Sequence, residues 1–93
     1  MKYRKTPGPF MDAENKIYHG MNYHAAKKLG IKYPYSENTV TYSTQSDKKA
    51  TVKHEAIELA IFKALPHISY KKAHELTGDL ETVIAALVAA GLI

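Results

Sequence analysis

Residues 52–65 read VKHEAIELAIFKAL, and this stretch decides the fold around it. At about 100° per residue, its large apolar side chains gather on one side of a helix, and the opposite side carries only lysines and alanines. His54, Glu55 and Glu58 fall inside the apolar arc. Charged groups are almost never fully buried unless they are paired or bind a metal. We therefore expect these three side chains to have partners, either within the chain or in a bound ion.

The composition indicates a single small domain. The chain has 93 residues, of which 45% are hydrophobic, and we expect residues 1–93 to share one modest core. No stretch is long and apolar enough to span a membrane, and the N-terminus lacks the apolar run of a signal peptide. Cysteine is absent. This excludes disulfides and thiolate chemistry, and it favours a cytoplasmic location.

Local signals predict a mixed N-terminal half and a helical C-terminal half. Residues 1–10 contain Pro7-Gly8-Pro9 and are predicted to be an irregular arm. Residues 16–19 and 39–42 favour short strands, the second with one solvated face because most of its side chains are polar. Helices are expected over Tyr23–Leu29, from Ser46 or Asp47 to just before Pro66, over Tyr70–Thr77 and over Leu80–Ala90. The fold class is therefore α+β, a single domain that ends in three helices.

Residues at the helix ends support these limits. Asn22 and Ser69 are good N-caps for the helices that follow them. Gly30 is expected to end the first helix in a left-handed C-cap. Gly78 is interpreted in the same way, with Asp79 capping a separate last helix.

His54 and Glu58 are four residues apart, so they share one helix face and can bind the same metal ion. The leading third ligand is His74, if a short turn folds its helix back antiparallel to the first; His67 is a reserve ligand near that turn. Two histidines and one carboxylate are the ligands of a catalytic zinc site. Glu81 lies seven residues after His74 and is predicted to orient that histidine from outside the ligand set.

This pattern resembles a group of small zincin-like proteins, in which an HExxE helix is followed by a YxxAH helix. The matching residues are His54-Glu55-x-x-Glu58, Tyr70-x-x-Ala73-His74 and Glu81, and the resemblance covers residues 38–81. It implies a minimal zincin core in which His54, Glu58 and His74 bind zinc or another divalent ion. It further implies that Glu55 is the catalytic acid/base, that Tyr70 and Glu81 support the ligands, and that Thr39–Tyr42 is an edge strand. Such a protein would be a metal-dependent hydrolase or peptidase that binds an extended peptide along that strand.

Two other interpretations remain open. The glutamates could pair with lysines from the N-terminal half while the histidines are hydrogen-bonded core residues, with no metal. Alternatively, the last three predicted helices have the lengths of a helix-turn-helix unit with Gly78 in the turn, which would make the chain a DNA-binding or protein-interaction module.

Nucleic-acid binding is possible on charge but is not favoured. The formal net charge is +4, yet the chain contains a single arginine, Arg4. The predicted last helix, over Leu80–Ala90, has no arginine, lysine, asparagine or glutamine with which to read bases.

Overall fold

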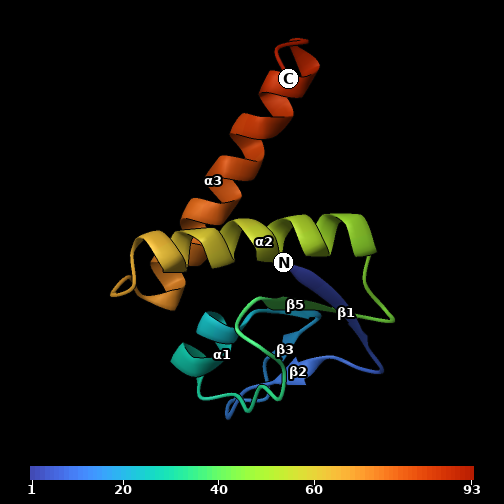
Figure 1. Ribbon diagram of the computed structural model, residues 1–93, viewed down its shortest axis with the longest axis vertical. Helices are drawn as coiled ribbons and strands as arrows, with labels where there is room; N and C mark the ends of the chain where they lie inside the picture. Colours follow the sequence, from blue (N-terminus) through green and yellow to red (C-terminus); the bar gives the residue numbers. More distant parts are fainter.

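The computed structural model describes residues 1–93 and places β5 at the centre of a three-stranded sheet. β5 pairs in parallel with β1 on one side and antiparallel with β4 on the other, with Lys2 opposite Thr39 and Gly20 opposite Tyr42. A second, two-stranded sheet joins β2 to β3 (Figure 1). The strands are β1 (Lys2–Thr6), β2 (Phe10–Met11), β3 (Ile17–Tyr18), β4 (Gly20–Met21) and β5 (Thr39–Ser43). With the three helices described below, these strands confirm the predicted α+β class.

Two predictions about the strands were wrong. The irregular arm expected at residues 1–10 contains β1, whose first four residues are exposed and only Thr6 is buried. The sequence of such a strand does not alternate between apolar and polar residues, so it gives no strand signal. β1 is held in place by backbone pairing with β5. As a result Thr39–Tyr42, expected at an edge, is the central strand. It has no solvated face either, since Thr39, Val40, Thr41 and Ser43 are all buried.

Three helices follow the predicted limits closely, with one exception. They are α1 (Tyr23–Leu29), α2 (Lys48–Ala64) and α3 (Tyr70–Ala89). The side chains of Asn22, Asp47 and Ser69 each accept a hydrogen bond from a backbone N–H in the first turn of α1, α2 and α3 respectively. Gly30 ends α1 in the left-handed conformation, with φ of 71°. The predicted capping of α1 and α3 is confirmed.

The exception is Gly78, which does not end a helix. α3 runs unbroken for 20 residues, so two helices, rather than three, form the C-terminal half, and Asp79 is not a cap. A glycine inside a helix destabilises it by only about 1 kcal/mol relative to alanine. Tertiary contacts on both sides of Gly78 outweigh this destabilisation, because Thr77 is buried and Glu81 binds a side chain of α2. The turn that a helix-turn-helix unit requires is therefore missing.

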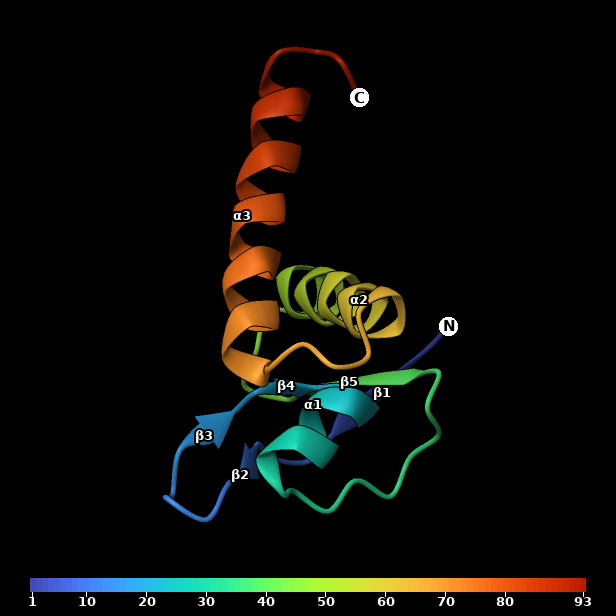
Figure 2. The same ribbon diagram turned by 90° about the vertical axis from the view of Figure 1, so that its left-hand side faces the viewer.

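α2 lies across one face of the three-stranded sheet, and α3 crosses it steeply instead of lying antiparallel beside it (Figures 1 and 2). α3 packs on the body of the molecule through its N-terminal part, as far as Glu81, and the rest of the helix projects away from it (Figure 2). The core lies where α1, β4, α2 and the start of α3 meet. It consists of Met21, Ala25, Ala26, Ile61, Phe62 and Ala73.

None of the three helices is long and apolar enough to cross a lipid bilayer. The cytoplasmic location stays a prediction.

Candidate metal site

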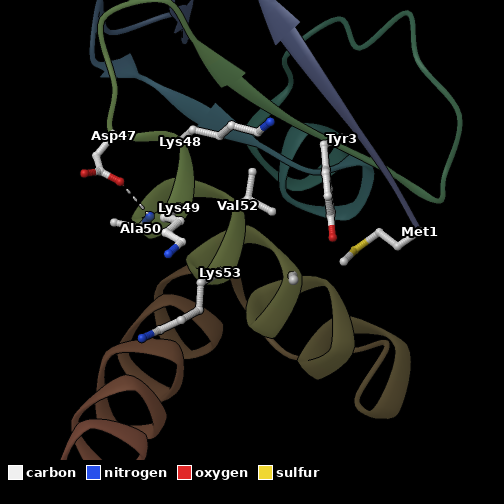
Figure 3. Close-up of a pocket in the computed structure, with 9 residues that line it drawn as sticks. Met1, Tyr3, Asp47, Lys48, Lys49, Ala50, Val52 and Lys53 are labelled. Atoms are coloured by element: carbon white, nitrogen blue, oxygen red, sulfur yellow. Dashed lines mark hydrogen bonds between the residues drawn. The ribbon is translucent and has the colours of Figure 1, made fainter.

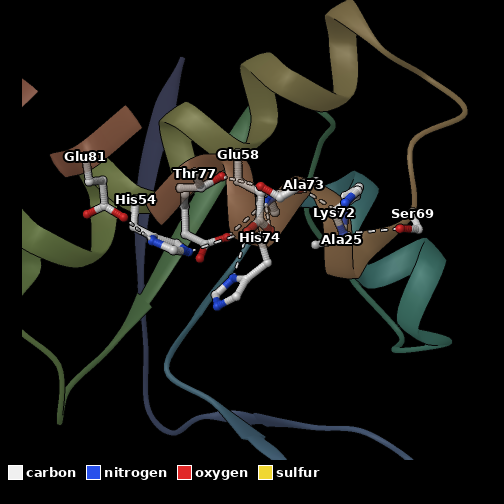
Figure 4. A network of polar contacts seen from close by, with 11 residues as sticks. Ala25, His54, Glu58, Ser69, Lys72, Ala73, His74, Thr77 and Glu81 are labelled. Atoms are coloured by element: carbon white, nitrogen blue, oxygen red, sulfur yellow. Dashed lines mark hydrogen bonds and ion pairs between the residues drawn. The ribbon is translucent and has the colours of Figure 1, made fainter. Parts of the chain in front are cut away.

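Three side chains from two helices converge on one point (Figure 4). His54 and Glu58 come from α2, and His74 comes from the second turn of α3. Nε2 of His54 lies 3.4 Å from Oε2 of Glu58, and Nδ1 of His74 lies 3.2 Å from the same oxygen. One ligand atom from each residue lies within 4.8 Å of the other two. The structure thus brings together the three predicted metal ligands.

Two of the three spacings among these atoms fit a tetrahedral ion. Zinc binds histidine nitrogen and carboxylate oxygen at about 2.0–2.2 Å, so two ligand atoms at a tetrahedral angle lie about 3.4 Å apart. The two distances to Glu58 Oε2 match that value. Three protein ligands would leave a fourth position for water or substrate, as in catalytic zinc sites.

Glu81 supports His54, and not His74 as predicted. Its Oε1 lies 2.6 Å from Nδ1 of His54, which directs the other ring nitrogen of His54 toward Glu58 (Figure 4). The difference follows from the continuity of α3. Seven residues of unbroken helix are about two turns, so Glu81 lies on the same face as His74 but about 10 Å farther along the helix axis. There it meets His54, which is one turn before Glu58 in α2. Carboxylate support of a histidine ligand is a common feature of zinc sites.

Asn22 holds both glutamates and was not recognised as a site residue from the sequence. Its Nδ2 donates to Oε1 of Glu55 at 2.9 Å and to Oε1 of Glu58 at 3.2 Å. Its Oδ1 accepts from the backbone N–H of Ala25, which is the capping bond of α1. The side chain is fully buried. The amide of Asn22 therefore holds one oxygen of each carboxylate, and the second oxygen of each is available for other contacts.

Glu55 lies at the base of a small cleft beside the three ligands. The cleft has a volume of about 200 Å³ and is lined by Tyr18, His19, Gly20, Thr51, His54, Glu55, Tyr70 and His74. Oε2 of Glu55 makes no hydrogen bond, and no buried polar side-chain atom in the chain lacks a partner, so this oxygen reaches solvent. Gly20 allows β4 to lie this close to α2, because a Cβ at position 20 would lie 2.5 Å from Thr51 and 3.0 Å from Glu55.

The electrostatics of the site favour proton retention. Burial, together with the negative charge of Glu58, raises the pKa of Glu55 to about 8. The hydrogen bond to Glu58 raises the pKa of His54 to about 9 against the opposing effect of burial, and Glu81 adds to the rise. In the absence of a metal, a proton on His54 thus compensates the charge of Glu58. A cation placed among the three ligands would take over that role.

Tyr70 forms one wall of the cleft. Its ring stacks on the imidazole of His74 at a centroid distance of 5.6 Å and meets the ring of Tyr18 edge-on at 6.1 Å. Burial and the nearby charges of Glu58 and Glu55 raise the pKa of its hydroxyl, so the hydroxyl stays protonated and can donate a hydrogen bond. Contact with His74 is consistent with the predicted supporting role of Tyr70.

The remaining alternatives can be compared with the same geometry. No lysine is ion-paired with Glu55 or Glu58, whose partners are Asn22 and the histidines. His67, the reserve ligand, is exposed in the turn before α3 and lies outside the cluster. A structural network of histidine, glutamate and asparagine without a metal remains compatible with these contacts.

No family model, no curated protein and no solved structure matches this chain. The resemblance to zincin-like proteins stays a prediction from the motif residues, and the function has to be inferred from the chemistry of the site.

Proposed function

We propose that this chain binds a divalent ion, zinc in particular, through His54, Glu58 and His74, and that it is a metal-dependent hydrolase. The observation that supports the proposal best is that the two buried glutamates face different parts of the site. Glu58 turns one oxygen toward both histidines, whereas Glu55 turns one oxygen toward the adjoining cleft. A purely structural network has no need of a second carboxylate that is buried and yet open at one oxygen.

When bound, zinc would supply Lewis acidity, which polarises a carbonyl group and lowers the pKa of water. Glu55 would act as the general base, accepting at Oε2 a proton from the water that attacks the substrate carbonyl carbon, and then as the general acid, returning that proton to the leaving group as its bond to the carbon breaks. Without a metal, the pKa of Glu55 is about 8, so the carboxyl group holds a proton near neutral pH. A cation bound beside it would lower this pKa, so that Glu55 could begin the reaction as a carboxylate and hold the transferred proton afterwards. Asn22 would keep Oε1 engaged, so that only Oε2 exchanges protons. The Tyr70 hydroxyl would donate to the developing negative charge on the substrate.

We propose an extended peptide as the substrate. The strand first expected to bind it, over Thr39–Tyr42, is paired on both sides. The free edge next to the cleft belongs to β4, and Gly20 of β4 lines the cleft itself. A peptide added along β4 would therefore place a backbone carbonyl beside the three ligands.

Metal content is the first test. Untagged protein is loaded with zinc, desalted and measured by elemental mass spectrometry, alongside His54→Ala, His74→Ala and His67→Ala. We expect near-stoichiometric zinc in the parent and in His67→Ala, because His67 is exposed and outside the cluster. Each ligand variant should lose the ion. Circular dichroism of the ligand variants would separate loss of metal from loss of fold. Equal zinc in all four proteins, or none in any, would refute the ligand assignment.

Hydrolysis is tested with Glu55→Gln on a mixture of fluorogenic peptides. Glutamine keeps the oxygen that accepts from Asn22 but cannot take a proton. We expect zinc binding like that of the parent and a rate lower by about 10²–10⁴-fold, the usual contribution of a general base. Cleavage by Glu55→Gln at the parental rate would remove Glu55 from the mechanism.

A further inference from the structure

The outer edge of β1 is open along its whole length. β1 pairs only with β5 and forms one border of the sheet. The N–H of Lys2 donates to Asn38, and the C=O of Thr6 accepts from Thr44, so both residues turn their backbone groups toward β5. Because alternate residues of a strand direct these groups to opposite sides, Tyr3 and Lys5 turn theirs to the open edge. A further strand could pair there.

Hollows flank this strand on both faces. Between β1 and α2 lies a hollow of about 670 Å³, lined by Met1 and Tyr3 on one side and by Val52 and the first turns of α2 on the other, from which Lys48 extends toward Tyr3 (Figure 3). On the other face is a hollow of about 240 Å³, lined by Lys2, Arg4 and Tyr35 among others. An added strand projects its side chains alternately to the two faces. Both sets of side chains would therefore find space.

The charge around this edge has one sign. Six cations surround it, and none of them is ion-paired. They are Lys2, Arg4 and Lys5 on β1, and Lys48, Lys49 and Lys53 on α2, and all but Lys5 line one of the two hollows. The one carboxylate among them, Asp47, is occupied in capping α2. The charge thus repels a second copy of this strand and attracts an acidic one.

We propose that the β1 edge, with the two hollows beside it, is a docking site for an extended acidic segment of another polypeptide. The partner pairs its backbone with Tyr3 and Lys5 and directs its acidic side chains to the six cations. Lys49, Val52 and Lys53 lie on the flank of α2 opposite His54 and Glu58, by their spacing along the helix. The docking site is therefore separate from the metal site, and neither proposal depends on the other.

Binding is tested by fluorescence anisotropy with the full chain and a labelled peptide of about eight residues in which pairs of glutamates are separated by single valines, so that glutamates project to both faces of the added strand. Three probes serve as comparisons: the same peptide with N-methylated alternate amides, the corresponding lysine-valine peptide, and oligothymidylate of equal charge. We expect the parent peptide to bind at least about tenfold more tightly than each of the three. In hydrogen exchange, the amides of Tyr3 and Lys5 should become protected when the peptide binds.

The charge requirement is tested with Lys48→Glu/Lys49→Glu. Both residues are exposed on α2, so the fold should be retained. We expect affinity to fall at least about tenfold. The matched control is Lys71→Glu/Lys72→Glu, which reverses an exposed lysine pair on α3 and should bind as the parent does.

Three results would overturn the proposal. Equal binding of the N-methylated peptide would mean that charge alone attracts the probe, without strand pairing. Tighter binding of oligothymidylate would assign the surface to nucleic acid. An equal loss in both lysine double variants would show that no particular surface is involved.

Discussion

At the scale of single residues, Asn22 does more than its place in the sequence suggests. It caps α1 and at the same time donates to two buried carboxylates of α2. His54, Glu55 and Glu58 could be identified from the sequence, because their spacing within one helix places them on a common face. His74 could be predicted as the third ligand on the single further assumption that its helix packs against α2. The bond from Asn22 to Glu55 spans 33 residues, and no local pattern can predict such a contact.

The role of Asn22 can be tested with Asn22→Ser. Serine is also a good N-cap, so α1 should form normally. The variant lacks the amide that positions Glu55 and Glu58, and we expect zinc affinity to fall by about 10–100-fold, as for other groups that orient metal ligands. Competition with a chromophoric chelator measures this change.

Asp47→Ala is the matched control for loss of a cap. It removes the capping side chain of α2, and we expect a stability loss of about 1 kcal/mol with little change in zinc affinity. Parental zinc affinity in Asn22→Ser would show that Asn22 is a cap and nothing more.

At the scale of elements, the helix ends were predicted well and the edge strand was not. Gly30 and Gly78 carry the same local signal, but only Gly30 adopts a positive φ. What separates them is tertiary: Thr77 is buried against the body of the molecule, and Glu81 reaches His54. β1 was missed because four of its five residues are exposed. Its pairing with β5 joins segments more than 30 residues apart and leaves no periodicity in the sequence.

A consequence for α3 is that Gly78→Ala should stabilise the protein. Nothing lies within 4 Å of a Cβ added at this position, and the residue is helical. Alanine should raise the free energy of unfolding by about 0.5–1 kcal/mol, because it reduces the entropy of the unfolded chain. Urea unfolding measures the change.

Gly30→Ala provides the comparison. The position is equally open, but its φ of 71° strains a residue with a side chain, so this variant should be less stable than the parent. A destabilising Gly78→Ala would mean that α3 bends at this position and is not a continuous helix.

At the scale of the whole molecule, the buried charges connect stability to pH. The pKa of His54 rises from 6.5 to about 9 on folding, and that of Glu55 rises from 4.5 to about 8. In both cases the folded state holds a proton that the unfolded chain has released, so stability falls as pH rises. The contribution of His54 is complete below pH 6.5 and is lost as pH rises through about 9. The penalty from Glu55 is absent below pH 4.5 and complete above about 8.

We therefore expect the metal-free protein to be less stable in urea at about pH 8.5 than at about pH 6, with each pKa unit worth about 1.4 kcal/mol. Zinc should reverse this trend, because its ligands must lose their protons before they bind it. His54→Asn in chelator should show a weaker pH dependence than the parent. Greater stability at the higher pH in the parent without metal would contradict the assigned protonation states.

The continuity of α3 has a mechanical consequence. His74 and Glu81 lie on the packed part of α3, and the remainder of the same helix extends away from the body (Figure 2). A continuous helix that is held at one end transmits a tilt of its free end to the residues near the held end. Any tilt of its free arm moves a ligand and the support of a second ligand together, while Glu58 stays fixed by Asn22. The geometry of the site is thereby coupled to the orientation of the projecting part of α3, which begins just after Glu81.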